Sequence, residues 1–160
     1  MKNIKLINFI DLSLEEQKMI LSWRNSPEIR KWMYSQDEIS LNHHLDFIES
    51  LRIRKDKEYF LVVKDEEYIG VVDFTDIKYK ESVTMGLYTN PNLKGQGRIL
   101  LEIIINYSFK ILHVKSVLSE VFYENKKAYD LYKRYNFKDK GEKIINNKKV
   151  IFMELEDENR

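Results

Sequence analysis

Two glycines stand one residue apart in the segment TNPNLKGQGRIL, in a chain of 160 residues that has only five glycines. The segment before them, residues 82–89 (SVTMGLYT), has the character of a strand. The segment after them, residues 98–112, is mainly apolar and long enough for a helix that packs on a sheet. Gly95 and Gly97 allow a tight turn between the two. A strand, a short loop and a helix are therefore predicted in that order.

A helix that begins directly after this loop presents free backbone N–H groups at its first turn. Those amides and the helix dipole favour an anion, and a glycine lets a phosphate approach the backbone closely. A plain strand-to-helix turn is the alternative. The loop is not a Walker motif, because no Lys-Ser/Thr pair follows Gly97, and it lacks the third glycine of a dinucleotide-binding fingerprint.

The remaining pattern predicts a mixed sheet with helices around it. Strands are expected within residues 2–9, in a hairpin over 58–77, at 82–89 and 116–122, and in a closing hairpin over 142–155 with NNKK at its tip. A first helix is expected from residue 14, because Ser13 and Glu16 can form a capping box there. A short helical turn is expected at 27–34, and a helix capped by Ser40 at 41–54. Two further helices are expected at 98–112 and at 124–137. The apolar residues Leu14, Ile20, Leu21, Trp23, Leu41, Leu45, Ile48 and Leu51 are expected to be buried by the first and third of these helices. No linker interrupts the chain, so residues 1–160 are expected to form a single domain.

The amino-acid composition argues against several classes of function. Lys and Arg (27) nearly balance Asp and Glu (26), and no basic block appears, which argues against a nucleic-acid partner and favours a small molecule or a protein. The chain has no cysteine, which excludes thiolate nucleophiles and cysteine zinc sites. The N-terminus has no signal-peptide pattern, and the apolar run 99–105 is far shorter than the ~20 residues of a membrane span. A cytoplasmic protein without a membrane partner is expected.

A second motif follows the glycine loop. It consists of Asn125, Ala128, Leu131, Tyr132 and Phe137, with Asn136 where glycine is usual, a mild departure since Asn tolerates positive φ. Together the two motifs resemble those of the GNAT acetyltransferase superfamily, although Asn92 replaces the usual Gln or Arg of the first. The resemblance implies the GNAT fold, in the α/β (α+β) class, with a mixed, mostly antiparallel sheet of about seven strands that is splayed between strands 4 and 5. It also implies acetyl-CoA as the co-substrate, bound by Leu87, Tyr88, Thr89, Lys94, Gly95, Gln96, Gly97, Arg98, Asn125 and Ala128.

The same resemblance implies direct attack of an amine on the thioester. Tyr132 is the expected acid for the departing thiolate, and the backbone N–H near Tyr88 is the expected donor to the oxyanion. Asp73 and Glu120 are candidates for the base, because each interrupts an apolar strand (GVVDF and SEVF). For either carboxylate, a solvent-facing position on its strand is the alternative.

The segment WRNSPEIRKWMYS and the helix after it resemble the N-acetyltransferases of bacterial pseudaminic acid biosynthesis, as do the segments YFLV, YIGVVDF and GLYTNPNLKGQG. These enzymes acetylate the 4-amino group of UDP-4-amino-4,6-dideoxy-N-acetyl-β-L-altrosamine, on the way to flagellin glycosylation. The resemblance implies an acceptor site formed by Arg24, Asn25, Trp32, Met33, Tyr34, His44, Phe47, Thr75 and Tyr88. The plainer alternative is that Trp32 and Phe47 belong to the core and that Arg24 ends a helix.

Two further functions stay open. The acceptor could be a ribosomal-protein N-terminus or a polyamine, although Arg24, Arg30 and Lys31 favour an anionic acceptor. A module that binds acetyl-CoA without turnover is the alternative outside enzymes. No metal site is expected, because the adjacent His43 and His44 would point about 100° apart on a helix. An exposed edge strand in the closing hairpin would favour a homodimer.

Overall fold

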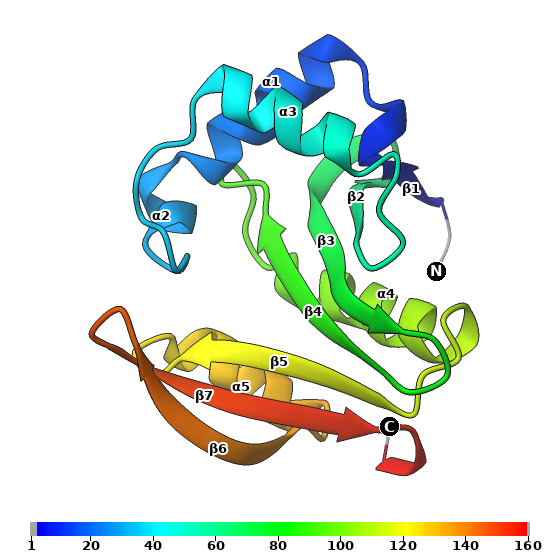
Figure 1. Ribbon diagram of the computed structural model, residues 1–160, viewed down its shortest axis with the longest axis vertical. Coiled ribbons are helices and arrows are strands. Elements are labelled where there is room, and N and C mark those ends of the chain that lie inside the picture. Colours follow the sequence, from blue (N-terminus) through cyan, green and yellow to red (C-terminus); the bar gives the residue numbers. More distant parts are fainter. Residues whose placement is uncertain (1–2, 160) are drawn as a thin grey trace.

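Seven strands form one mixed sheet, with helices on both of its faces, in the computed structural model, which describes residues 3–159 (Figure 1). The strands are β1 (Ile4–Asn8), β2 (Glu58–Lys64), β3 (Glu67–Lys78), β4 (Ser82–Thr89), β5 (Ser116–Phe122), β6 (Lys138–Ile145) and β7 (Lys148–Glu156), and their order in the sheet is β1-β2-β3-β4-β5-β7-β6. The helices are α1 (Leu14–Arg24), α2 (Pro27–Arg30), α3 (Leu41–Ser50), α4 (Gly97–Lys110) and α5 (Lys126–Arg134), with 3-10 turns at Phe9–Asp11 and Asp157–Asn159.

The sheet is split in its middle. β4 and β5 are its parallel pair, joined through α4, and they pair only where Ser82–Thr84 meets residues 116–118. Beyond these positions the two strands diverge, whereas β5 pairs with β7 along its whole length. The splay between strands 4 and 5 and the mixed, mostly antiparallel sheet confirm the fold class expected from the sequence.

Each face of the sheet has its own core. On one face, Leu61 and Val71 pack with Ile20 and Trp23 of α1 and with Ile48 of α3. On the other face, the alternate strand residues pack under α4 and around α5 in a larger cluster, which includes Phe60, Val72, Phe74, Val83, Met85, Leu100, Ile104 and Tyr132. Because side chains alternate along a strand, Asp73 lies on the α1–α3 face with Val71.

Most of the local predictions are confirmed. Ser13 and Glu16 form the capping box of α1, and the hydroxyl of Ser40 accepts from the N–H of His43 at the start of α3. Asn136, at the position where glycine is usual, has φ 72°.

Several boundaries and burial expectations were wrong. α2 ends at Arg30 instead of running to residue 34, and β6 begins at Lys138, ahead of residue 142. Leu14 (53% exposed) and Leu41 (37% exposed), the first residues of α1 and α3, are not buried, and Leu21 and Leu45 are only half-buried.

One edge strand of the sheet is β6, and nearly all of its residues are exposed. The homodimer that was expected from this edge stays a prediction. In the described residues 3–159, no helix combines the length and hydropathy that crossing a membrane requires.

Candidate active site

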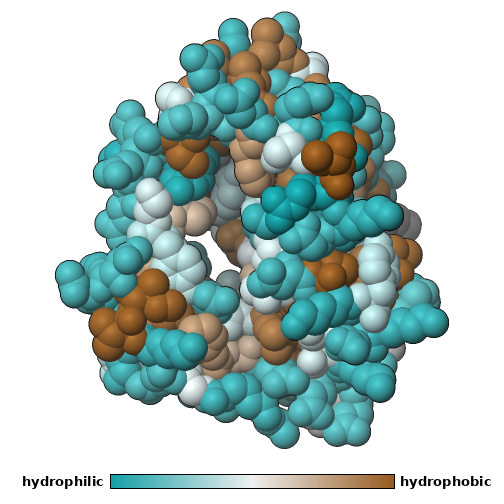
Figure 2. Space-filling view, viewed as in Figure 1, coloured by the Kyte–Doolittle hydropathy of each residue, from teal (hydrophilic) through white to brown (hydrophobic). Residues whose placement is uncertain are grey.

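An open cavity of about 800 Å³ lies where β4 and β5 part, and it is visible as a hollow between the two halves of the molecule (Figure 2). Most of the residues predicted for the site line this cavity. They are Arg24, Trp32, Met33, Tyr34, His44, Phe47, Asp73, Thr75, Leu87, Tyr88, Thr89, Glu120, Asn125, Ala128 and Tyr132. Segments far apart in the sequence thus contribute to one cavity.

The cavity passes through the splay and therefore has two sides. Asp73, Thr75, Tyr88 and the segment that follows α2 line it on the α1–α3 face. Tyr132, which belongs to the opposite core, lines it from α5, together with Asn125 and Ala128 at the start of that helix. Two substrates can therefore meet at the splay from opposite faces of the sheet.

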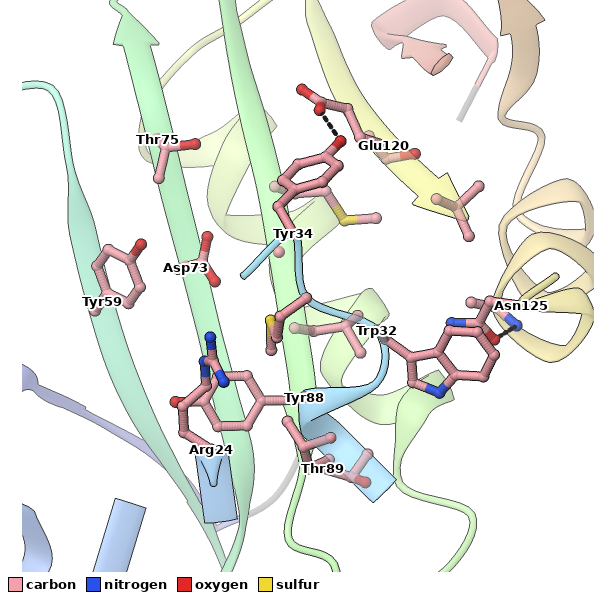
Figure 3. A pocket seen from close by; sticks show the side chains of 18 of the residues that line it. Arg24, Trp32, Tyr34, Tyr59, Asp73, Thr75, Tyr88, Thr89, Glu120 and Asn125 are labelled. Atoms are coloured by element: carbon pink, nitrogen blue, oxygen red, sulfur yellow. Dashed lines mark hydrogen bonds between the residues drawn. The ribbon is translucent and has the colours of Figure 1, made fainter. Parts of the chain in front are cut away.

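Asp73 projects from β3 toward β4 (Figure 3). Its cross-strand neighbour is Gly86, and a Cβ added to Gly86 would lie 2.6 Å and 2.7 Å from the two carboxylate oxygens of Asp73. Burial raises the pKa of Asp73 to about 7, and the positive charge of Lys57 partly opposes this shift. This carboxyl group can therefore exchange a proton near neutral pH.

Glu120 lies across the splay on β5, and its exposed side chain accepts a hydrogen bond from the hydroxyl of Tyr34 (Figure 3). The ring of Tyr34 also packs edge-on against Phe122, at 5.6 Å between centroids. Burial and this carboxylate raise the pKa of Tyr34, so its phenol stays protonated and able to donate. The segment after α2 thereby bridges the two halves of the sheet.

Tyr132 is buried, and its hydroxyl has no hydrogen-bond partner within residues 3–159. Burial raises its pKa to about 12, and the negative charge of Asp73 adds to the shift. At neutral pH the phenol is protonated, as the acid in a transfer reaction must be.

Arg24, the last residue of α1, reaches the cavity wall beside Tyr88 (Figure 3). Its Nη2 donates to the carbonyl of Ser35 at 3.1 Å, while its Nη1 is buried with no partner among the described residues. Burial lowers the pKa of Arg24, Arg30 lowers it further, and Tyr88 raises it. The guanidinium thus has hydrogen-bonding capacity to spare and a burial cost that an anion would offset.

The loop that contains Gly95 and Gly97 leads into the N-terminus of α4, and its first part, with Pro91 and Leu93, lines the cavity, whereas the two glycines do not. Gly95 is exposed and has φ 75°, a left-handed conformation that favours glycine. Within residues 3–159, no side-chain hydrogen bond caps α4, whose N-cap residue is Gln96. Backbone amides at this helix end are therefore available to an anion, and the anion site expected from the sequence stays a prediction.

Six predicted residues do not line the cavity in the described part of the chain. Five of them are Lys94, Gly95, Gln96, Gly97 and Arg98, which form the loop and first turn at its mouth. The sixth is Asn25, whose carboxamide donates to the carbonyl of Ile39 and accepts from its N–H, at 2.9 Å and 2.8 Å. Both ends of this amide thus hold the segment between α2 and α3, and the substrate-binding role expected for Asn25 stays a prediction.

Three further predicted residues line the cavity and also make contacts within the protein. His44 is buried, its Nε2 lies 2.8 Å from the carbonyl oxygen of Gln17, and burial lowers its pKa. Phe47 packs edge-on against Tyr59 at 5.0 Å between centroids, and Trp32 lies 6.5 Å from Phe122. Phe47 and Trp32 therefore belong both to the cavity wall and to aromatic clusters within the protein.

The residues that the sequence reasoning missed include Gly86 and Tyr59, which also line the cavity. Gly86 carried a signal, since a glycine inside a strand often marks a close approach of another group. Ser119, on β5, is a further cavity residue with a buried hydroxyl that lacks a partner in residues 3–159.

Comparison with known proteins gives the site its context. The profile described as "Acetyltransferase (GNAT) family" matches residues 18–137. Acetyltransferase PseH of Campylobacter jejuni subsp. jejuni serotype O:23/36 (strain 81-176) is 44% identical over 134 residues, 84% of this chain and 84% of that protein. The crystal structure of the Campylobacter jejuni N-acetyltransferase PseH in complex with acetyl coenzyme A matches with a TM-score of 0.81 and 36% identity, covering 96% of this chain and 99% of that one.

A further structure shares the architecture. Spermidine N-acetyltransferase from Vibrio cholerae, in complex with CoA and spermine, matches with a TM-score of 0.88 over 99% of this chain and 98% of that one. The sequence identity is 22%, so this match concerns the fold alone.

Proposed function

The chain belongs to the acetyltransferase (GNAT) family, as its two motifs predicted, and from this premise we propose that it acetylates the 4-amino group of a UDP-4-amino-4,6-dideoxy-N-acetylhexosamine. It is an acetyl-CoA-dependent N-acetyltransferase. The proposal concerns the acceptor. The acceptor that we propose is the β-L-altrosamine form, whose acetylation is a step of pseudaminic acid biosynthesis and of flagellin glycosylation.

The proposal rests on the guanidinium of Arg24. This group lies in the cavity wall on the α1–α3 face of the sheet, where we place the acceptor. Its Nη1 has no internal partner within residues 3–159, and Arg30 adds positive potential. A sugar nucleotide brings a diphosphate, which pairs well with a partly buried guanidinium. The similarity to PseH over 84% of the chain supports the same choice.

The aromatic and apolar side chains around Arg24 suit the rest of such a ligand. Trp32, Met33 and Tyr34 come from the segment after α2, and Phe47 comes from α3. Their flat or flexible surfaces suit a uracil ring and the 6-methyl group of a dideoxy sugar. Thr75 contributes a hydroxyl to the same side.

The proposed chemistry is a direct transfer. Acetyl-CoA lies along β4, beside Leu87 and Thr89, with its diphosphate at the N-terminus of α4, near Lys94 and Arg98. The neutral amine attacks the thioester carbonyl, a backbone N–H near Tyr88 stabilises the oxyanion, and the hydroxyl of Tyr132 protonates the thiolate. A cavity carboxylate takes the proton of the amine.

A polyamine is the main competing acceptor. The cavity wall contains the carboxylates of Glu28, Asp73 and Glu120, which would attract a polycation. Arg24 opposes this, because a cation would have to approach a guanidinium that is already partly desolvated. A protein N-terminus is a second competing acceptor, and a module that binds acetyl-CoA without turnover is the competing function outside enzymes.

Release of CoA thiol, measured with acetyl-CoA and three acceptors, tests the proposal. The acceptors are UDP-4-amino-4,6-dideoxy-N-acetyl-β-L-altrosamine, spermidine and a peptide with a ribosomal-protein N-terminus. We expect kcat/KM to be at least about tenfold higher for the nucleotide sugar, since one charge-assisted contact contributes this much. Faster reaction with spermidine would make the enzyme a polyamine acetyltransferase, and binding of acetyl-CoA without thiol release from any acceptor would favour a binding module.

A variant pair tests the role of Arg24 in the same assay. Arg24→Gln should raise KM for the nucleotide sugar at least about tenfold while leaving KM for acetyl-CoA unchanged. Arg52→Gln is the matched control, because Arg52 is exposed and pairs with Glu49 on α3. An unchanged KM in Arg24→Gln would remove the diphosphate contact from the proposal.

A further inference from the structure

Asp73 and Gly86 face each other across β3 and β4, on the side of the sheet that the acceptor occupies. A Cβ on Gly86 would meet both carboxylate oxygens and the Cγ of Asp73, at 2.7 Å, 2.6 Å and 2.9 Å. All three nearest atoms to that missing Cβ belong to Asp73. The carboxyl group therefore lies in a notch on β4 that exists because residue 86 has no side chain.

Within residues 3–159, the Asp73 carboxylate has no hydrogen-bond donor, although it lies in the cavity wall. Glu120, the other candidate base, is held by the hydroxyl of Tyr34. A carboxylate that is removed from water and lacks a donor is a stronger base than one that is hydrogen-bonded. Of the two, Asp73 is therefore the group that is free to accept a proton from a ligand.

We propose that Gly86 positions the catalytic base of this enzyme, because its missing side chain leaves the notch from which the Asp73 carboxylate takes the proton of the acceptor amine. Gly86 is a positioning residue and Asp73 a catalytic one. The inference rests on the proposed function for the presence of an acceptor amine on this face, but not on the identity of the acceptor.

The step balances with groups of this chain. The amine nitrogen forms a bond to the thioester carbonyl carbon, and Asp73 accepts the proton that leaves the nitrogen. The C–S bond then breaks, and Tyr132 gives its hydroxyl proton to the thiolate. After product release, Asp73 loses its proton and the Tyr132 phenolate regains one by exchange with solvent in the open cavity that both groups line, which restores both groups.

The environment of Asp73 sets its pH dependence. Lys57 precedes β2 and favours the charged carboxylate, while Tyr59 of β2, Tyr88 of β4 and Tyr132 of α5 are the titratable groups that interact with it. Burial dominates and places its pKa at about 7. Because the base must be ionised, kcat/KM should fall as the pH drops through about 7.

Four variants test the inference: Asp73→Asn, Asp73→Ala, Gly86→Ala, and the double variant with Asp73→Ala and Gly86→Ala. We expect Asp73→Asn to lower kcat at least about tenfold and to lose the acid limb near pH 7, with acetyl-CoA affinity within about twofold of the parent. Gly86→Ala should lower kcat similarly and destabilise the fold, because its methyl group displaces the carboxylate. In the Asp73→Ala background, the same methyl group should cause no further loss of stability or of acetyl-CoA affinity.

Each contrary result would overturn the inference. An Asp73→Asn variant that keeps kcat and the acid limb shows that another group is the base. A Gly86→Ala variant that keeps kcat shows that the notch is not needed. An equal loss of stability or acetyl-CoA affinity with and without Asp73 shows that the new methyl group meets something else.

The assay uses the nucleotide sugar, or spermidine if only spermidine is acetylated, so failure of the proposed acceptor leaves this test intact. A second measurement, on the free enzyme, needs no acceptor at all. In a ¹³C NMR titration of the free enzyme, the Asp73 carboxyl should titrate near pH 7, and in Gly86→Ala its midpoint should move toward 3.8, because the group is pushed into the open cavity. An unchanged midpoint in a folded Gly86→Ala variant would contradict the notch.

Discussion

Tyr132 reaches the cavity from α5 with a hydroxyl that no residue in 3–159 engages. Its neighbour on the same helix, Tyr129, donates to both carboxylate oxygens of Asp139, at 3.1 Å and 2.8 Å. One tyrosine thus has its proton committed to the protein, while the other offers its proton to a ligand. This difference makes the pair suitable for a matched test of the catalytic acid.

Replacing Tyr132 by Phe should lower turnover at least about tenfold and leave acetyl-CoA affinity nearly unchanged, because only the proton donated to the thiolate is lost. Steady-state kcat and a direct binding titration with acetyl-CoA measure the two effects. Tyr129→Phe is the control and should keep its turnover. If Tyr132→Phe turns over as fast as the parent, this tyrosine has no part in the reaction.

Single residues also show which roles can be predicted from the sequence and which cannot. The roles of Ser13 and Asn136 were predictable, because caps and left-handed positions depend on contacts within a few residues. The bond from Tyr34 to Glu120 joins residues 86 positions apart, and no local pattern marks it. Gly86 carried the local signal of a glycine within a strand, but the sequence could not show that the group approaching it is Asp73 of the neighbouring strand.

At the scale of elements, the turn from β4 into α4 depends on the backbone conformation of Gly95. Its φ is 75°, and a Cβ there would meet nothing within 4 Å, so strain and not space restricts this position. Elsewhere the chain uses Asn at such positions, including Asn146 and Asn147 in the tip between β6 and β7. Asn tolerates the left-handed region better than Ala does.

Gly95→Ala should therefore weaken acetyl-CoA binding roughly five- to thirtyfold, because a left-handed Ala costs ~1–2 kcal/mol. Gly95→Asn should retain most of the affinity, since the two variants add bulk at the same open position but differ in strain. A binding titration with acetyl-CoA compares them. Equal losses in both variants would show that bulk at the loop, and not its backbone conformation, limits binding.

The elements themselves were largely predictable. Strand alternation and the caps located the seven strands and the main helices, with boundary errors where tertiary contacts decide, as at the end of α2. After Arg30 the backbone continues in tighter turns, in which the N–H groups of Trp32 and Met33 donate to carbonyls three residues earlier. The amide of Asn25 then holds Ile39 near the end of α1. Such a tie across 14 residues has no counterpart in hydrophobic periodicity.

For the whole molecule, the splay between β4 and β5 is the feature that joins fold and function. It lets residues from both faces of one sheet line a single cavity, with Tyr132 on one side and Arg24 and Asp73 on the other. The sequence motifs indicated the splay only through resemblance to a family. Which side chains face each other across it could not be read from the sequence, because this depends on the register of β4 against β3 and β5.

We propose that acetyl-CoA and a nucleotide sugar occupy the two sides of this cavity at the same time and react without a covalent enzyme intermediate. Initial rates measured while both substrates are varied, with UDP as the inhibitor, distinguish this mechanism from its alternatives. We predict intersecting double-reciprocal lines and inhibition by UDP that is competitive with the nucleotide sugar but not with acetyl-CoA. Parallel lines, or competition between UDP and acetyl-CoA, would contradict it.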